Sequence, residues 1–141
     1  MCPPLLKLCG EAEYRAHYQR VYVDGGAVVT FDGMEVSFFP EQFGHSFYRD
    51  STPTARDKAD FQRQRAERID WIGAVLRDPS AEVYRRQMPD GKTHRIALWA
   101  RQRYAVIVQI RKKRPNSARF ITAYVVDSDS ALAKMRGNPR W

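Results

Sequence analysis

The fold is decided by residues 82–126, which read EVYRRQMPDGKTHRIALWARQRYAVIVQIRKKRPNSARFITAYVV. Runs rich in Val, Ile and aromatic residues alternate there with turn signals, which is typical of β-strands joined by tight connections. We expect strands at 83–88, 93–101, 104–111 and 119–126. The links between them are a Pro-Asp-Gly turn, a two-residue link and a basic loop at 112–118. Because these links are short, consecutive strands are expected to pair antiparallel.

The chain before this sheet predicts an arm and a helix. A helix at 11–19, a strand at 21–23 and turns at Asp-Gly pairs form an N-terminal arm over residues 1–40. A loop at 40–53 leads to one long helix, which begins at a capping box of Thr54 and Asp57, ends at Arg77 and carries an apolar stripe. A short final helix is capped by Ser128.

The predicted architecture is therefore α+β. It consists of an N-terminal helix and β-hairpin arm, one long helix, a four-stranded antiparallel meander sheet and a short C-terminal helix. With 141 residues and 43% hydrophobic residues, the chain fits a single compact domain, in which residues 1–40 are the arm and residues 41–141 the main unit.

The charge is concentrated on the predicted sheet. The formal net charge is +8, and the segment 85–119 carries eleven basic residues against the single acid Asp90. Such a face suits a polyanion such as RNA. The alternative is that Arg and Lys at strand edges prevent aggregation between sheets. The expected nucleic-acid contacts outside the strand interiors are Arg101, Arg111, Lys112, Lys113 and Arg114.

Other classes of protein are disfavoured. No run of residues is long and apolar enough for a membrane span or a secretory signal, so we expect a soluble, cytoplasmic chain. Cys2 and Cys9 are expected to be reduced thiols, and they are too few for a zinc site. Phosphate-loop, serine-hydrolase and metallopeptidase motifs are absent from the sequence. We therefore expect neither a metal nor a cofactor.

Imidazole is the side chain suited to proton transfer near neutral pH, and the chain has three histidines. His45 is the strongest candidate, because it lies in a glycine-containing loop between Phe43 and Phe47. The alternative is an ordinary loop histidine that caps a backbone carbonyl. His94 lies beside basic residues and suits contact with a phosphate, whereas His17 lies in an acidic helix.

Two strands contribute further candidates. In the strand 93–101, the period-two rule puts Arg95, Trp99 and Arg101 on an open face opposite Ile96 and Leu98. In the strand 119–126, the same rule puts Thr122 and Tyr124 on the face of Phe120. The alternative for a buried Thr or Tyr is a simple hydrogen bond to the backbone.

Residues 45–126 resemble a ribonuclease family. The resemblance rests on His45 in its Phe-Gly-His-Ser-Phe loop, on the helix text Arg-Ala-Glu-Arg-Ile-Asp-Trp-Ile at 65–72, and on the strand Phe-Ile-Thr-Ala-Tyr at 120–124. These segments are similar to phage-associated members of the barnase, EndoU, colicin and RelE-like ribonuclease superfamily. In that superfamily, helices precede a four-stranded antiparallel sheet whose open face holds the active site.

The resemblance implies metal-independent cleavage of RNA, often tRNA, by a toxin-like effector of phage-related origin. Its catalytic set would be His45, Arg68, Thr122 and Tyr124, with phosphate held by Arg65 and Arg95. Residues 1–40 lie outside the resemblance. They would be an accessory, an oligomerisation surface or the docking place of a cognate inhibitor.

Three functions remain open. The first is this ribonuclease. The second is a nucleic-acid-binding accessory protein on the same scaffold, which does not cleave. The third is a phage structural or protein-interaction module whose charge serves solubility.

Overall fold

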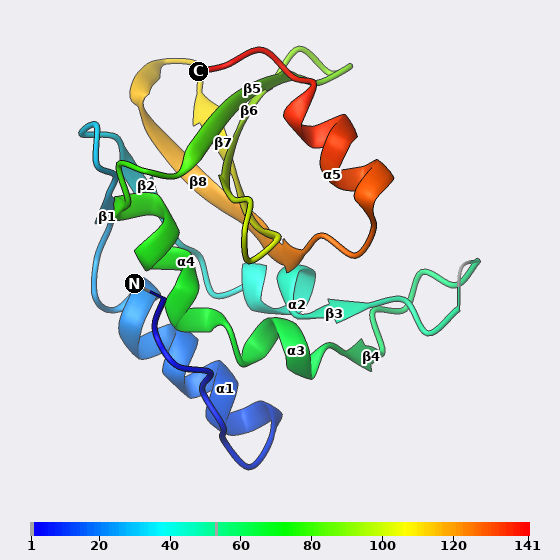
Figure 1. The fold of residues 1–141 in the computed structure, drawn as a ribbon. Coiled ribbons are helices and arrows are strands. Elements are labelled where there is room, and N and C mark those ends of the chain that lie inside the picture. Colours follow the sequence, from blue (N-terminus) through cyan, green and yellow to red (C-terminus); the bar gives the residue numbers. More distant parts are fainter. Residues whose placement is uncertain (1, 53) are drawn as a thin grey trace.

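Figure 1 shows the fold as a computed structural model, which describes residues 2–52 and 54–141. Four strands pair antiparallel in chain order, and the α+β class is confirmed. These strands are β5 (Glu82–Gln87), β6 (Thr93–Trp99), β7 (Tyr104–Arg111) and β8 (Arg114–Val125). The basic loop expected at 112–118 is wrong, because Lys112 and Lys113 form a turn that leads directly into β8.

The sheet is larger than the predicted meander. The strands β1 (Val28–Val29) and β2 (Glu35–Ser37) form a hairpin, and β2 pairs parallel with residues 117–119 of β8. The result is a mixed six-stranded sheet in the order β1-β2-β8-β7-β6-β5. The N-terminal segment thus adds two strands to the same sheet.

The first helix continues where a strand was expected. The helix α1 (Glu11–Tyr18) runs into a π-helical turn, η1 (Gln19–Val23), so the predicted strand at 21–23 is wrong. Tyr14, Tyr18 and Tyr22 follow one another at four-residue steps and are all buried, which puts one aromatic edge of the helix against the core. Gly25 lies two residues after the end of η1, where any side chain would collide with the carbonyl of Val21.

The predicted long helix over 54–77 is also wrong. The helix α2 (Gln42–Ser46) and the strand β3 (Tyr48–Arg49) occupy the expected loop, and β3 pairs with β4 (Asp60–Phe61) in a second, two-stranded sheet. Helical structure resumes as α3 (Arg63–Ala66) and α4 (Ile69–Arg77).

Local hydrogen bonds explain the missing first turns. The expected capping box does not form, because the carboxylate of Asp57 accepts from the backbone N–H and hydroxyl of Ser51, at 2.9 and 2.7 Å. The amide of Gln62 donates to the carbonyl of Phe47 at 2.7 Å and so joins the two hairpin strands. The apolar stripe predicted for the later turns, with Ile69, Ile72, Val75 and Leu76, is buried as expected.

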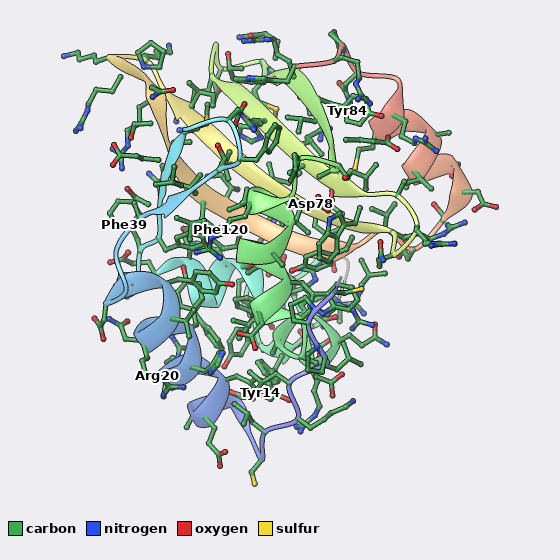
Figure 2. All side chains as sticks on the ribbon, turned by 60° about the vertical axis from the view of Figure 1, so that its left-hand side comes forward. Tyr14, Arg20, Phe39, Asp78, Tyr84 and Phe120 are labelled. Carbon is green, nitrogen blue, oxygen red and sulfur yellow. The ribbon has the colours of Figure 1, made fainter. Side chains whose placement is uncertain are left out.

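Helices cover both faces of the large sheet. The main core lies between the sheet and α1, α2 and α4, and a smaller core lies under α5 (Asp129–Arg136) on the opposite face (Figure 1). Phe120 belongs to the first core and Tyr84 to the second (Figure 2). The prediction that Ser128 caps α5 is confirmed, because its hydroxyl accepts from the amide of Ala131 at 3.1 Å.

A β-bulge in β8 changes which residues share a face. Val108 pairs with Phe120 while Ile107 pairs with Thr122, so Ile121 is an extra residue. Phe120 therefore packs into the main core, whereas Thr122 and Tyr124 face the α5 side. The expectation that these three side chains share one face is wrong for this reason.

Within the described residues, no helix combines the length and the apolar character needed to cross a membrane.

Candidate functional site

One polar row crosses the sheet on the α5 side. Arg86 pairs with His94, His94 pairs with Gln109, and Gln109 pairs with Arg119. Directly paired residues point to the same side of a sheet, so the four side chains form a continuous line over β5, β6, β7 and β8.

This row is open because α5 covers only the neighbouring part of the face. Two residues farther along β5, β6 and β7 from the polar row, the side chains on this face are the apolar Tyr84, Ile96 and Ile107. They pack with Met135 of α5 in the smaller core. The polar row lies beyond that contact. Half of the face is therefore packed, and the other half faces solvent.

A cleft of about 570 Å³ borders the open half. Gln109, Arg119, Thr122 and Tyr124 line it from the sheet, together with Ile121. Its other walls are made by Gln42 and His45 of α2, Arg65 of α3, Lys58 of the β3–β4 connection and Lys92 of the β5–β6 turn. Among these lining residues, all in the described part of the chain, none is acidic. The cleft therefore presents positive charge to an anion.

The helix α2 is positioned by the free edge of β8. Because β2 pairs only as far as Arg119, the next backbone groups of β8 lack a strand partner. The side-chain amide of Gln42 donates to the carbonyl of Ile121 at 2.9 Å, and the amide of Ala123 donates to the Ser46 hydroxyl at 3.3 Å. Gln42 and Ser46 are buried, so these bonds satisfy polar groups that water cannot reach.

This docking sets the place of His45. The residue is exposed and lines the cleft from the turn between Gln42 and Ser46. The Ser46 hydroxyl also lies 3.3 Å from the hydroxyl of Thr122, which links α2 to the site residues of β8. Sequence reasoning missed Gln42 and Ser46, because a Gln and a Ser in a short helix give no sign that a strand edge needs them.

Arg65 offers a guanidinium without a carboxylate partner. It donates to the carbonyl of Ser46 at 3.0 Å and lies 5.7 Å from the ring centre of Tyr124. Burial and the nearby charge of Arg49 lower its pKa. No ion pair to Arg65 occurs within residues 2–52 and 54–141. Its charge is therefore available to an anion in the cleft.

Arg119 is the second available guanidinium. Its Nε atom is buried without a hydrogen-bond partner in the described structure, and its guanidinium lies 5.5 Å from the ring centre of Phe39. Sequence reasoning did not select Arg119, although its place next to the apolar Phe120 in a strand puts it on the opposite face.

His94 is half-buried in the polar row. Burial lowers its pKa, while a hydrogen bond with Gln109 opposes that effect and the charge of Arg86 adds to it. A pKa below the ordinary value favours the neutral imidazole at neutral pH.

Arg95 does not lie on an open face. It is 1% exposed, and its two terminal nitrogens donate to the two carboxylate oxygens of Asp32 at 2.9 and 3.0 Å. The β1–β2 hairpin covers that face of β6, which the strand pattern alone does not reveal. The role expected for Arg95 as a phosphate ligand is incompatible with this position.

Trp99 and Arg68 are also drawn into the main core. The indole of Trp99 is 8% exposed and donates to Asp78 at 2.8 Å, so it offers no surface for stacking a base. The guanidinium of Arg68 lies 5.1 Å from the ring centre of Trp71 and donates to the carbonyl of Gln64. Neither residue lines the cleft.

The remaining basic residues lie at opposite ends of the sheet. Arg101 is exposed in the β6–β7 turn, far along the strands from the polar row. The β7–β8 turn lies at the same end of the sheet as the polar row, beside the β5–β6 turn. A Cβ atom added to Gly91 of the β5–β6 turn would lie 3.6 Å from the ammonium of Lys112 in the β7–β8 turn. The other basic side chains at that turn are Arg111, Lys113 and Arg114. They flank the cleft without lining it.

The cleft brings together cations, hydroxyls and the imidazole of His45, and His94 lies in the neighbouring polar row. Within the described residues, no three His, Cys, Asp or Glu side chains are placed to hold a metal ion. Comparisons with protein-family models, with curated proteins and with solved structures find no match to this chain.

Proposed function

We propose that the protein binds RNA in the cleft and cleaves it with its own side chains. The observation that carries this proposal is the acid-free cleft, which combines His45, Arg65 and Arg119 with the hydroxyls of Thr122 and Tyr124. A phosphodiester is an anion, and its cleavage needs added negative charge to be stabilised and protons to be moved. The cleft supplies groups for each task.

The proposed reaction begins at the ribose. A base takes the proton of the 2′-OH, O2′ bonds to phosphorus, the P–O5′ bond breaks, and an acid protonates O5′. The products are a 2′,3′-cyclic phosphate and a 5′-OH. His94 does not line the cleft itself but pairs on the sheet with Gln109, which does, and its lowered pKa favours the neutral form that a base needs. His45, which lines the cleft, would then be the acid.

The cations act on the phosphoryl oxygens. Arg65 and Arg119 would hold the phosphate and stabilise the charge that develops on it, since neither forms an ion pair within residues 2–52 and 54–141. Thr122 and Tyr124 would donate hydrogen bonds that orient the phosphate. The open half of the sheet leaves room for a polymer to enter and leave the cleft.

The test is cleavage of total tRNA and of a mixed single-stranded RNA in EDTA. We expect wild type to give 2′,3′-cyclic phosphate ends, and His45→Ala to lower the rate by about 100-fold or more while RNA still binds. His17→Ala is the matched control, because His17 pairs with Asp70 outside the cleft at 2.7 Å. Equal cleavage by wild type and His45→Ala would refute the assignment of His45.

One observation favours a binding protein that does not cleave. In the described structure no hydrogen bond orients the imidazole of His45, whereas a general acid or base is normally held by a second group. A binding protein predicts that RNA is retarded in a gel and stays intact under all conditions. A charged surface that serves only solubility predicts no salt-sensitive affinity for RNA.

A further inference from the structure

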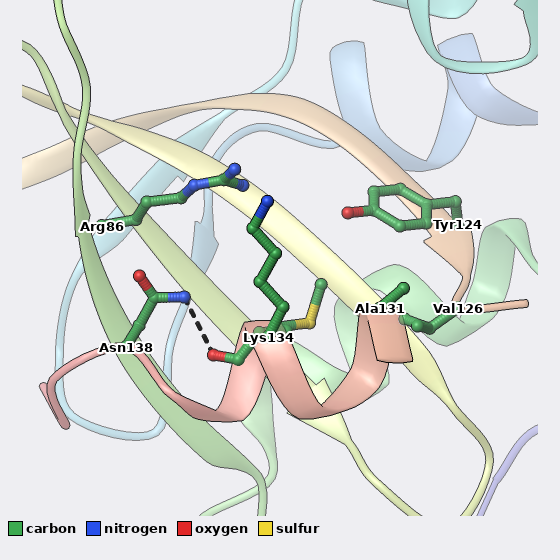
Figure 3. A pocket seen from close by; sticks show the side chains of 7 residues that line it. Arg86, Tyr124, Val126, Ala131, Lys134 and Asn138 are labelled. Carbon is green, nitrogen blue, oxygen red and sulfur yellow. Dashed lines mark hydrogen bonds between the residues drawn. The ribbon is translucent and has the colours of Figure 1, made fainter. Parts of the chain in front are cut away.

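A second cavity lies between α5 and the sheet, beside the cleft. It has a volume of about 230 Å³ and is walled by Arg86, Tyr124 and Val126 of the sheet side (Figure 3). Tyr124 lines both this cavity and the cleft. A ligand in the second cavity would therefore continue directly into the proposed RNA site.

The helix α5 and the segment after it form the other wall of the cavity. Ala131, Lys134 and Met135 line the cavity from α5, and Asn138 lines it from the segment that follows the helix. Met135 is buried and packs in the smaller core. Lys134 is exposed at the rim of the cavity, and Asn138 is partly buried beside Met135.

Two cations converge at the cavity from opposite walls. Figure 3 shows Arg86 reaching from β5 and Lys134 from α5, with the hydroxyl of Tyr124 directed toward them. Neither cation forms an ion pair within residues 2–52 and 54–141, and no carboxylate lines the cavity. An anion between them would relieve the repulsion of the two charges.

The rest of the cavity suits a flat, partly apolar group. Val126 and Met135 are nearly fully buried and make its floor, and the ring of Tyr124 makes one side. The side-chain amide of Asn138 donates to the carbonyl of Met135 at 2.9 Å, which leaves its Oδ1 atom as a free acceptor (Figure 3). A cavity with apolar residues on its floor and an amide oxygen as acceptor fits a nucleobase, whose edge carries N–H donors.

We propose that this cavity is a nucleotide subsite, in which one base of the RNA inserts against Tyr124 and Met135 while its phosphate lies between Arg86 and Lys134. The inference rests on the proposed function for the polymer, and it adds the place of the nucleotide next to the one in the cleft. Ordering that nucleotide fixes the register of the chain, so the neighbouring phosphate is presented to Arg65 and Arg119.

The test uses full-length protein and a 2′-O-methyl RNA tetranucleotide, which cannot be cleaved by 2′-OH attack. Ala131→Phe fills the cavity without changing charge. Ala133→Phe is the matched control, because Ala133 is exposed on the same helix and does not line the cavity. We expect Ala131→Phe to weaken binding about tenfold, as expected for the loss of one stacked base, and Ala133→Phe to bind as wild type.

A second pair of variants, which removes charge and adds no side-chain volume, covers the case in which Ala131→Phe disturbs α5. Lys134→Gln should weaken binding several-fold more than Lys7→Gln, which removes the same charge from the N-terminal segment, outside both the cavity and the cleft. Equal binding by wild type, Ala131→Phe and Lys134→Gln would overturn the subsite. Tight binding of the tetranucleotide with no cleavage of ordinary RNA would overturn the ribonuclease and leave the subsite standing.

Discussion

The ion pair between Asp32 and Arg95 supports a quantitative prediction. Asp32→Ala removes both hydrogen bonds from a guanidinium that is 1% exposed and whose Nε atom already lacks a partner in the described structure. Leaving a buried charge unpaired costs about 3–5 kcal/mol. The Asp32 side chain is 35% exposed, so water can reach the vacated position, and we expect the lower figure of about 3 kcal/mol.

The assay is urea unfolding followed by far-UV circular dichroism. With a slope of about 2 kcal/mol per molar urea, the loss corresponds to a fall of about 1.5 M in the midpoint. Glu35→Ala is the matched control, since Glu35 is an exposed carboxylate on the same hairpin, and it should change stability by less than about 0.5 kcal/mol. The double variant Asp32→Ala, Arg95→Met should recover most of the loss, because no charge is then left buried.

The same pair predicts a pH dependence. Burial raises the pKa of Asp32, but hydrogen bonds from Arg95 and Thr30 outweigh it, and the net pKa lies below the ordinary value. A carboxyl whose pKa is lower in the folded state stabilises the fold above its unfolded pKa and loses that contribution as the pH falls through the folded value. The difference between wild type and Asp32→Asn should therefore shrink below about pH 4. A stability loss no larger than that of Glu35→Ala would refute a structural role for the pair.

Two further predictions concern the polar row. His94 has a lowered pKa in the folded state, so the unfolded chain binds more protons below about pH 6.5. Wild type should lose stability as the pH falls through that value, and His94→Gln should lose less in parallel urea titrations; identical slopes would contradict a buried, neutral imidazole. Arg119→Gln should weaken RNA binding and reduce the salt slope of the affinity by about one, whereas Arg101→Gln, at the far end of the strands, should change neither. Equal slopes for the two variants would place the RNA outside the cleft.

The antiparallel part of the sheet could be predicted because its signals are local. Alternating apolar residues and short turns in 82–126 identify β5, β6 and β7 to within about two residues. The pairing of β2 with β8 has no such signal, because three residues pair in parallel with a segment about eighty positions later. The predicted long helix over 54–77 is wrong for a related reason. Its apolar period runs on through Phe61, but hydrogen bonds to Phe47 and Ser51 hold that segment extended.

The strand pattern correctly predicted which side chains of β6 alternate, but it wrongly predicted that the face with Arg95 and Trp99 is open to solvent. Arg95 and Trp99 do alternate with Ile96 and Leu98, yet the side of β6 that holds Arg95 and Trp99 is covered by α4 and the first hairpin. A strand pattern records that two faces differ; it does not record which distant element covers each. The bidentate partner of Arg95 is sixty-three residues away, and no local rule connects them.

The candidate site forms at the β-bulge of β8. The extra residue Ile121 turns Thr122 and Tyr124 away from the main core and toward the open face. At the same point β2 ends, and the backbone edge that it leaves is taken by Gln42 and Ser46, which brings His45 to the cleft. A continuous β8 paired along its whole length would bury Thr122 among apolar groups and would exclude α2. The β-bulge at Ile121, which made the period-two prediction wrong, is therefore the feature that brings together the imidazole of His45, the two hydroxyls and the guanidinium of Arg65.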